Sequence, residues 1–336
     1  DPVRTFCIGF DEPDYDESGY AKAVAEHLGT VHTELKVTPD EAMAVIPQLA
    51  AIYDEPFADS SAIPTILVCR LARKQVTVAL SGDAGDELFG GYNRYPQLSD
   101  LWGQMQARPA WLSNGLSVLY GAGRRVCSLV GCENLAQKFL WHENYAKIQT
   151  MPELYANLLT HCNSLDFALS EPPNLPLKPK TFPVSTPYHY GMACDTTEYL
   201  PGDGLVKVDR AAMSCSLETR IPLLDHRIVE WAWTLPESHK ADTQKSKKVL
   251  RTVLYRYLPE SMMDRPKKGF GVPVGEWIRG PLVDWAESLM SETAIRKAGI
   301  LHPRRARAIW TAHRDRKVDD PYRVWALLML QAWLLK

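Results

Sequence analysis

The segment from Val76 to Tyr92 constrains this chain more than any other, because an apolar run leads directly into small residues and three acids. The run from Val76 to Leu80 is short, rich in β-branched residues and flanked by polar ones, which is typical of a buried strand in a parallel sheet. The carboxyl end of such a strand is where open α/β sheets bind ligands. The segment therefore predicts an α/β fold with a binding site at the end of this strand.

The residues after this strand are suited to binding a nucleotide with its metal ion. Gly82 and Gly85 let the backbone approach a phosphate or a ribose, and three acids, Asp83, Asp86 and Glu87, supply the oxygen ligands that Mg²⁺ prefers. Because Asp83 and Asp86 lie three positions apart at the start of a helix, both carboxylates can face one metal ion. The alternative is a solvated acidic turn in which one acid caps the helix.

The sequence Ser-Gly-Asp-x-x-Asp-Glu-Leu-Phe-Gly-Gly-Tyr at residues 81–92 resembles the second ATP-site motif of the asparagine synthetase (glutamine-hydrolysing) family. Further blocks resemble the family in the same order along the chain, at residues 54–61, 208–213, 216–225 and 265–270. Several blocks in the family's order are far more specific than any one of them. The resemblance therefore extends over most of the chain.

This resemblance implies both a fold and an activity. The fold is α/β, an adenine nucleotide α-hydrolase-like (PP-loop ATPase) parallel sheet with a large all-helical C-terminal part. One domain would span residues 1–336, with a nucleotide-binding part at 1–95 and a helical part at 96–336. In the family, ATP and Mg²⁺ activate the side-chain carboxylate of aspartate as an adenylate, releasing pyrophosphate. Ammonia, supplied by an N-terminal glutaminase domain, then converts the adenylate into asparagine and AMP.

The resemblance also implies roles for particular residues. Asp83 and Asp86 would bind Mg²⁺, and Asp83 would take part in the chemistry, although the family often has glutamate there, which leaves its exact role open. Lys267 would stabilise the charge that develops on the α-phosphate as pyrophosphate leaves; without the resemblance, it would be interpreted as part of a solvated basic loop. Three positions would contact AMP: Ser81, Gly82 and Ile8. The residue pattern alone would place Ile8 in the core.

Two arginines in the later blocks are candidates for ligand contact. Arg210 and Arg220 could bind pyrophosphate or a carboxylate, because guanidinium groups bind both in a bidentate manner. Glu218 and Arg220 are equally consistent with a substrate contact and with a buried ion pair. We expect Asp225 to have a structural role.

The predicted elements before residue 92 follow the order strand, helix, strand, helix, helix, strand, which implies a parallel sheet with right-handed crossovers. Strands are expected at residues 4–10, 31–37 and 76–80, and helices at 17–28, from 38 or 40 to 53, and at 62–74. We expect Gly29 to end the first helix and Thr38 or Asp40 to cap the second. Ser60 and Ser61 are expected to cap the third, and the alternative is that they contact substrate. After residue 92 we expect helices and no strand, at residues 99–120, 133–147, 203–217, 225–234, 246–257, 281–298, 303–315 and 321–335.

Charge and cysteine content exclude several classes of protein. Lys and Arg, 38 residues, nearly balance Asp and Glu, 40 residues, without a long basic run, so we expect no nucleic-acid partner. The seven cysteines are odd in number and show no Cys-x-x-Cys spacing, which argues against a disulfide framework and a structural zinc site. Reduced thiols in the cytoplasm fit this pattern best.

Two further segments have an unusual composition. The apolar stretch from Val324 to Leu335 is shorter than the roughly 20 residues of a bilayer span, so we expect no membrane partner and a buried terminal helix. The alternative is an interface with a partner, such as a second copy in a homodimer. The proline-rich segment Glu171–Pro187 is incompatible with regular helix or sheet, and we expect a linker or a lid there.

The start of the chain leaves two alternatives to the asparagine synthetase hypothesis. The chain begins at Asp1 without the Ser-Gly-Gly-x-Asp-Ser pyrophosphate loop that precedes this strand in the family, so we expect a longer parent and an inactive 336-residue chain. One alternative keeps the chemistry but changes the acceptor to another carboxylate, as in relatives from polysaccharide or secondary-metabolite pathways or β-lactam synthetases. The other is a non-catalytic nucleotide-binding module.

Overall fold

A computed structural model describes residues 2–10, 16–129, 132–160, 167–168, 181–242, 245–263 and 271–336. The chain forms two compact units, each made from two separate stretches of sequence. Unit 1 comprises Asp1–Tyr92 and Asp195–Pro273, and unit 2 comprises Asn93–Cys194 and Val274–Lys336. The protein is a mostly helical α/β fold with small parallel sheets. The predicted functional division at residue 95 stays a prediction.

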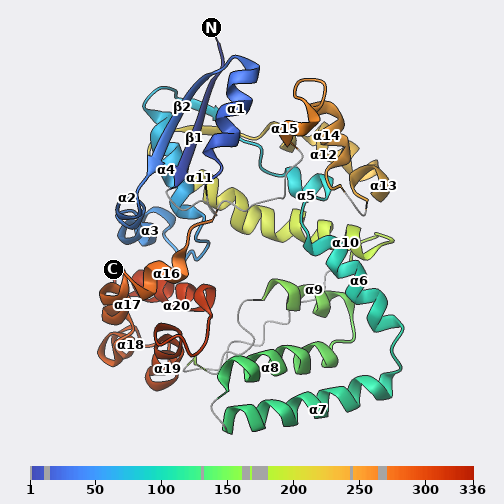
Figure 1. Cartoon of the computed structure of the whole chain (residues 1–336), viewed down its shortest axis with the longest axis vertical. Helices are drawn as coiled ribbons and strands as arrows, with labels where there is room; N and C mark the ends of the chain where they lie inside the picture. The colour runs from blue at the N-terminus through green and yellow to red at the C-terminus, as the bar shows by residue number, and fades with distance from the viewer. Residues whose placement is uncertain are drawn as a thin grey trace. The chain divides into compact units, whose positions relative to one another are not determined.

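Unit 1 begins with a β-α-β element. Strands β1 (Arg4–Phe10) and β2 (Val31–Val37) pair in parallel, with Arg4 opposite Val31. Helix α1 (Ser18–Leu28) contacts both strands and lies beside them in Figure 1. It ends at Gly29, whose φ of 66° places it in the left-handed region that favours glycine. Both strands and the end of the helix confirm the sequence-based prediction.

The next three helices lead from β2 to a third strand. They are α2 (Pro39–Met43), α3 (Ile46–Tyr53) and α4 (Ala62–Arg73). Thr38 caps α2, because its side chain accepts a hydrogen bond from the backbone N–H of Glu41 while the Glu41 side chain accepts one from the N–H of Thr38. The single helix predicted to reach Tyr53 is divided in two, since Pro47 lacks an N–H and lies in the first turn of a new helix.

Strand β3 (Val78–Leu80) forms a second parallel pair, with β4 (Glu218–Arg220). The pairing continues at both ends, where the N–H of Glu218 donates to the Thr77 carbonyl and the N–H of Ser81 donates to the Arg220 carbonyl, both at 2.9 Å. The prediction of no strand after residue 92 was wrong, because β4 is short and has no apolar period. The prediction of a buried strand was also wrong: Val78 is 49% and Leu80 75% exposed.

The remaining elements of unit 1 are helical. They are helix α5 (Gly85–Phe89), a π-helical segment η1 (Asp195–Gly204), α11 (Leu205–Met213), a 3₁₀ turn η2 (Pro222–Leu224), α12 (His226–Thr234), α13 (Glu237–Lys240), α14 (Lys248–Leu254) and α15 (Glu260–Met263). Three of them, η1, α12 and α14, contact α5, the helix that follows β3. One buried apolar cluster joins α5, η1 and α12 through Ala84, Leu88, Phe89, Leu200 and Ala232. This cluster packs the start and the body of α5 against η1 and α12.

The regular elements in the described residues of unit 2 are all helices, apart from one isolated bridge between Ala168 and Leu301. Its helices are α6 (Arg94–Gln106), α7 (Ala110–Leu129), α8 (Glu133–Lys147), α9 (Met151–Leu159), α10 (Pro187–Cys194), α16 (Val274–Arg279), α17 (Val283–Leu289), α18 (Glu292–Ala298), α19 (Pro303–Arg314) and α20 (Pro321–Leu334). Helices α7 and α8 pack side by side as a hairpin (Figure 1). A core of Leu98, Tyr145, Leu154, Tyr155 and Cys194 joins α6, α8, α9 and α10.

The C-terminal helix α20 is buried, as predicted, with Val324, Trp325 and Leu328 fully inaccessible to solvent. None of the helices in the described part of the chain combines the length and the apolar content that a membrane span requires. The proline-rich segment lies mostly outside the described residues, which resume at Thr181.

Candidate active site

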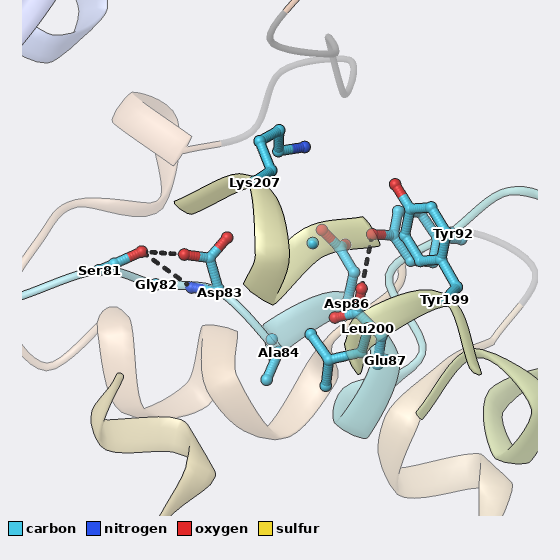
Figure 2. A pocket seen from close by; sticks show the side chains of 12 residues that line it. Ser81, Gly82, Asp83, Ala84, Asp86, Glu87, Tyr92, Tyr199, Leu200 and Lys207 are labelled. Carbon is cyan, nitrogen blue, oxygen red and sulfur yellow. Dashed lines mark hydrogen bonds between the residues drawn. The ribbon is translucent and has the colours of Figure 1, made fainter. Parts of the chain in front are cut away.

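A pocket of about 210 Å³ opens where β3 ends (Figure 2). Its volume is below the roughly 300 Å³ at which sites for whole drug-sized ligands begin, so it suits a phosphate group or a small amino acid rather than an entire nucleotide. All of its lining residues belong to unit 1. They are Ser81, Gly82, Asp83, Ala84, Gly85, Asp86, Glu87, Tyr92, Tyr199, Leu200, Gly204 and Lys207.

The backbone turns sharply between β3 and α5. Ala84, the N-cap residue of α5, has a φ of 67°, a left-handed conformation that is uncommon for alanine. Because Ala84 has no polar side chain and holds the N-cap position, neither Asp83 nor Asp86 caps this helix there. Backbone strain of this kind costs on the order of 1 kcal/mol and is concentrated at functional sites. The turn leaves Asp83 and Asp86 lining the same pocket.

Asp83 is held by its neighbour Ser81. The Ser81 hydroxyl donates to the Asp83 carboxylate, and the backbone N–H of Asp83 donates to the Ser81 hydroxyl oxygen at 3.4 Å (Figure 2). A Cβ atom built on the intervening Gly82 would meet no atom of the described residues within 4 Å apart from its two chain neighbours, so a ligand can approach the backbone at this position. The loop thus presents a fixed carboxylate beside open space.

Asp86 lies against the backbone of Gly91. The N–H of Gly91 donates to the Asp86 carbonyl at 2.8 Å, and a Cβ built on Gly91 would lie 1.7 Å from Oδ1 of Asp86. Only glycine therefore leaves room for the Asp86 carboxylate in its present position. The Nζ of Lys247 lies 3.0 Å from the same Oδ1.

Glu87 and two tyrosines form one side of the pocket. The Tyr92 hydroxyl donates to Glu87 Oε1 at 2.7 Å, and the ring of Tyr199 meets that of Tyr92 edge to face at 6.0 Å (Figure 2). Burial raises the pKa of the Glu87 carboxyl, and the nearby charges of Asp86 and Asp195 act in the same direction. Burial also raises the pKa of the Tyr92 phenol, with Glu87 as the next cause. Tyr92 therefore remains the proton donor in this pair.

Lys207 is the basic residue among those that line the pocket, and it pairs with Asp59. Its Nζ lies 2.7 Å from Asp59 Oδ2. Burial acts against the charged form of both partners, yet the ion pair outweighs it, lowering the pKa of Asp59 and raising that of Lys207. Ser61 donates its hydroxyl to the same Asp59 oxygen at 2.8 Å and makes no side-chain cap for α4, so the prediction of capping by Ser61 was wrong.

The donor set of this pocket fits Mg²⁺ that is shared with a phosphate ligand. Among the residues that the structure describes, no group of three or more His, Cys, Asp or Glu side chains could hold a metal ion by itself. Mg²⁺, however, usually keeps several waters and binds one or two carboxylates together with substrate phosphates. Asp83 and Asp86 supply two such carboxylates on one pocket, and the open backbone at Gly82 leaves room for a phosphate.

Four of the predicted site residues line the pocket together: Ser81, Gly82, Asp83 and Asp86. Two others do not line it. Ile8 is buried in β1, opposite Leu35 of β2, and Arg210 of α11 directs its guanidinium to the carbonyl of Tyr53 at 3.5 Å. Lys267 lies outside the described residues.

Glu218 and Arg220 pair with each other on one face of β4, with side chains 48% and 67% exposed, so the predicted buried pair is an exposed one. Asp225 caps α12 by accepting from the N–H of Arg227, which agrees with its predicted structural role.

Sequence reasoning missed several residues that line or contact the pocket, and the polar ones among them are Lys207, Tyr199 and Lys247. Lys207 and Asp59 are 148 positions apart, so no local spacing connects them. The π-helical turns of η1, which carry Tyr199, also have no apolar period of the usual helical kind. The one available signal was that Asp59 and Lys207 both lie in or beside blocks that resemble the family.

Known proteins resemble this chain along almost its whole length. The sequence profile of the Asparagine synthase family matches residues 1–335. Asparagine synthetase (glutamine-hydrolyzing) 1 of Bacillus subtilis is 30% identical over 98% of this chain and 52% of its own length. A Mycobacterium tuberculosis protein with a provisional name of the same kind is 32% identical over 98% of this chain and 50% of its own. Amidase chyE of Penicillium rubens is 24% identical over 89% of this chain and 48% of its own.

The α/β fold and the acidic pocket at the end of a parallel strand define an α/β protein with a candidate ligand site at the carboxyl end of a strand. The match over nearly every residue identifies the chain as a member of the asparagine synthase family, which is a family of ATP-dependent ligases. The chain spans about half the length of the curated relatives named above.

Proposed function

We propose that this chain is the synthetase part of a glutamine-dependent asparagine synthetase and that it activates aspartate with ATP. A side-chain carboxylate oxygen of aspartate would attack the α-phosphorus of ATP, forming aspartyl-adenylate and releasing pyrophosphate. Ammonia would then attack the acyl carbon, the bond to the AMP oxygen would break, and a proton would be lost, giving asparagine and AMP. The observation that carries this proposal is that Asp83 and Asp86 line one pocket at the end of β3.

The two acids would share one role at this pocket, and Asp83 would have a second. Asp83 and Asp86 would hold Mg²⁺, which supplies positive charge to neutralise the polyphosphate when it is bound. Asp83, oriented by the Ser81 hydroxyl, would also accept the proton that the attacking ammonia loses. This role needs an ionised carboxylate beside open space. The backbone at Gly82 leaves that space.

The other predicted residues have more peripheral places in this proposal. Ser81 and Gly82 would seat the phosphate end of AMP, and Ile8 would meet the adenine through its main chain. Lys267 would neutralise charge on the α-phosphate as pyrophosphate leaves. Arg210 is assigned a supporting role, because its guanidinium contacts the carbonyl of Tyr53. The remaining predicted pair, Glu218 and Arg220, is assigned to the structural alternative because these side chains pair with each other.

The finer fold assignment belongs to the same proposal. The two parallel pairs, β1 with β2 and β3 with β4, are consistent with an adenine nucleotide α-hydrolase-like sheet of the PP-loop type. Residues 1–95 would form its nucleotide-binding part and residues 96–336 its helical part. A glutaminase domain of the parent protein would supply the ammonia.

An isotope experiment tests the adenylation directly. Aspartate labelled with ¹⁸O in its side-chain carboxylate is incubated with the full-length protein that carries this sequence, ATP, Mg²⁺ and ammonia. We expect one labelled oxygen to appear in AMP, because the oxygen that attacks the phosphorus stays with it when the amide forms. Unlabelled AMP, or ADP as the product, would overturn the mechanism. Labelled AMP from another carboxylic acid but none from aspartate would overturn aspartate as the acceptor. The similarity to Amidase chyE is a reason to test other labelled carboxylic acids in the same assay.

A further inference from the structure

A second pocket of unit 1 opens beside strand β2. It has a volume of about 250 Å³ and shares no lining residue with the acidic pocket. Its walls come from consecutive parts of the chain, namely β2, the α2–α3 region and α4. The function proposed above uses none of these lining residues. The pocket is therefore a candidate for a separate ligand.

Most of the lining is apolar. Leu35 and Val37 are alternate residues of β2, so their side chains lie on the same face of the strand. Val45 adds apolar surface before α3, and Leu67 adds it from α4. Val37 is 0% and Val45 1% exposed, so the floor of the pocket is part of the protein core. An apolar group of a ligand would be removed from water here.

A guanidinium group is held at this pocket without a carboxylate partner. Arg70 of α4 donates from Nη2 to Oε1 of Gln48 at 2.7 Å, and Gln48 donates from Nε2 to the carbonyl of Ala44 at 3.0 Å. These two hydrogen bonds fix the guanidinium group at the pocket. Among the described residues, no Asp or Glu pairs with Arg70. Since a guanidinium group has five N–H donors and binds carboxylates in a bidentate manner, Arg70 is suited to a carboxylate ligand.

An acid of fixed position lines the same pocket from α2. Oε2 of Glu41 accepts hydrogen bonds from the N–H of Thr38 at 2.9 Å and from its hydroxyl at 3.1 Å. In the described part of the chain, Oε1 of Glu41 has no such partner and is available to a cation. The pocket thus combines an apolar floor with one cation and one anion. A free α-amino acid carries the complementary groups, a carboxylate, an ammonium and a side chain, on a single carbon atom.

We propose that this pocket binds a free α-amino acid with an apolar side chain, such as leucine. Arg70 binds its carboxylate, Glu41 binds its ammonium group, and the apolar floor takes the side chain. The volume is below the roughly 300 Å³ at which sites for drug-sized ligands begin, as expected for a ligand of this size. Aspartate and asparagine bind poorly, because their polar side chains would lose water without gaining a hydrogen bond.

A titration of the full-length protein followed by ligand-detected NMR tests the specificity. We expect leucine to bind with a Kd on the order of 1 mM. Alanine should bind at least about tenfold more weakly, because it buries less apolar surface. Asparagine should also bind at least about tenfold more weakly. Isocaproate, which is leucine without the ammonium group, should bind about threefold more weakly, from the loss of an exposed ion pair.

Two variants and a matched control locate the ligand. Arg70→Met should weaken leucine binding about tenfold, from the loss of a charge-assisted contact. Ala44→Phe places a ring at an exposed position of the lining and should abolish binding. Arg73→Met is the control, because Arg73 is on the same helix but does not line the pocket, and it should bind leucine like the wild type.

Weakened binding in both pocket variants, with the wild-type affinity in Arg73→Met, would support the proposal. No saturable binding of leucine up to about 10 mM, or equal affinities for leucine and asparagine, would overturn it. A leucine affinity unchanged in Arg70→Met would also overturn it. If Arg70→Met does not fold, the result for Ala44→Phe decides in the same way. None of these readouts depends on turnover, so the test is independent of the function proposed above.

Discussion

The acidic pocket of unit 1 and an ion-pair network in unit 2 both gather charged side chains, but they balance the charge differently. In unit 2, Arg279 of α16 lies 2.9 Å from Glu276 and 2.9 Å from Asp319, and Arg316 lies 3.0 Å from Glu276. Two carboxylates thus meet two guanidinium groups. This network is electrically complete without a ligand.

The pocket of unit 1 carries an excess of acid. Asp83, Asp86 and Glu87 line it together with one basic residue, Lys207, which is already paired with Asp59 outside the lining. Lys247, also outside the lining, pairs with Asp86. Four carboxylates thus meet two ammonium groups. The backbone beside the pocket is left-handed at Ala84. The comparison teaches that clustered charge alone does not mark a site. A surplus of one sign on a strained backbone does, because such an arrangement is costly unless a ligand of the opposite charge binds.

The largest expected effect follows from removing one negative charge from the acidic pocket. Asp83→Asn should slow aspartate-dependent pyrophosphate release about a thousandfold, because asparagine cannot carry the negative charge that the reaction uses. The Ser81 hydroxyl keeps a partner, so the free energy of unfolding should change by less than about 1 kcal/mol. Glu276→Gln is the control in the balanced network and should leave the rate unchanged. Equal rates in Asp83→Asn and the wild type would show that the acidic pocket is no more important for the reaction than the ion-pair network of unit 2.

The second effect comes from displacing a carboxylate without changing its charge. Gly91→Ala would place a Cβ 1.7 Å from Oδ1 of Asp86, so the carboxylate must move. We expect the steady-state rate to fall about a hundredfold, as for other misplacements of about 1 Å in active sites. Gly103→Ala in α6 of unit 2 is the control, since among the described residues beyond its chain neighbours and its own helix backbone its Cβ would meet no atom within 4 Å. If both variants kept the wild-type rate, the position of Asp86 would not matter to catalysis.

The third effect is on stability and belongs to unit 2. Arg279 is nearly buried, and Arg279→Met would leave Glu276 and Asp319 without their main partner. We expect the free energy of unfolding in urea to fall by about 2 kcal/mol, less than for a fully buried pair because both carboxylates reach solvent. The affinity of unit 1 for Mn²⁺ should stay the same. A change in that affinity would show that the two clusters are coupled.

The smallest effect concerns Lys240, a charged residue that belongs neither to the acidic pocket nor to the ion-pair network. Its side chain is fully buried, no described residue accepts a hydrogen bond from Nζ, and the ammonium lies 4.8 Å from the centre of the Trp233 ring. Burial lowers the pKa of Lys240 from 10.5 to about 8. This penalty of a few kcal/mol is offset partly by the cation–π contact, so Lys240→Met should stabilise the protein by about 1 kcal/mol at pH 7.

The pH dependence of Lys240 has a definite sign. Between pH 8 and 10.5 the unfolded chain holds a proton on Lys240 that the folded protein has lost. The wild-type free energy of unfolding should therefore rise with pH in this window relative to that of Lys240→Met. Urea unfolding of both proteins at pH 7, 9 and 10.5 measures the difference. Parallel pH profiles for the two proteins would contradict a lowered pKa.

The sequence predicted the parts of the fold that have local signals. Strands β1 and β2 and helix α8 have the predicted bounds, and the cap at Thr38 and the stop at Gly29 depend on residues within one helical turn. The sequence did not predict the short strand β4, because its three residues, Glu-Thr-Arg, owe their strand geometry to pairing with β3. Local pattern cannot indicate a partner so far away along the chain.

The same distinction holds for the site. The acids Asp83 and Asp86 lie just after a strand, in a segment whose residue types already indicate phosphate and metal chemistry. Lys207 and Lys247 are single lysines on other segments, and only the packing of α11 and α14 brings them to Asp59 and Asp86. The roles of Ile8, Arg210 and Lys267 stay predictions.

Pyrophosphate release by the full-length protein tests the central claim most directly, namely that the acidic pocket serves an ATP-dependent activation of aspartate. The protein is supplied with ATP, Mg²⁺ and ammonia, and pyrophosphate and AMP are measured with and without aspartate. We predict that both products form in equal amounts, that aspartate is required, and that Asp83→Asn releases almost none. Release that does not depend on aspartate, or that persists in Asp83→Asn, would contradict this account of the pocket.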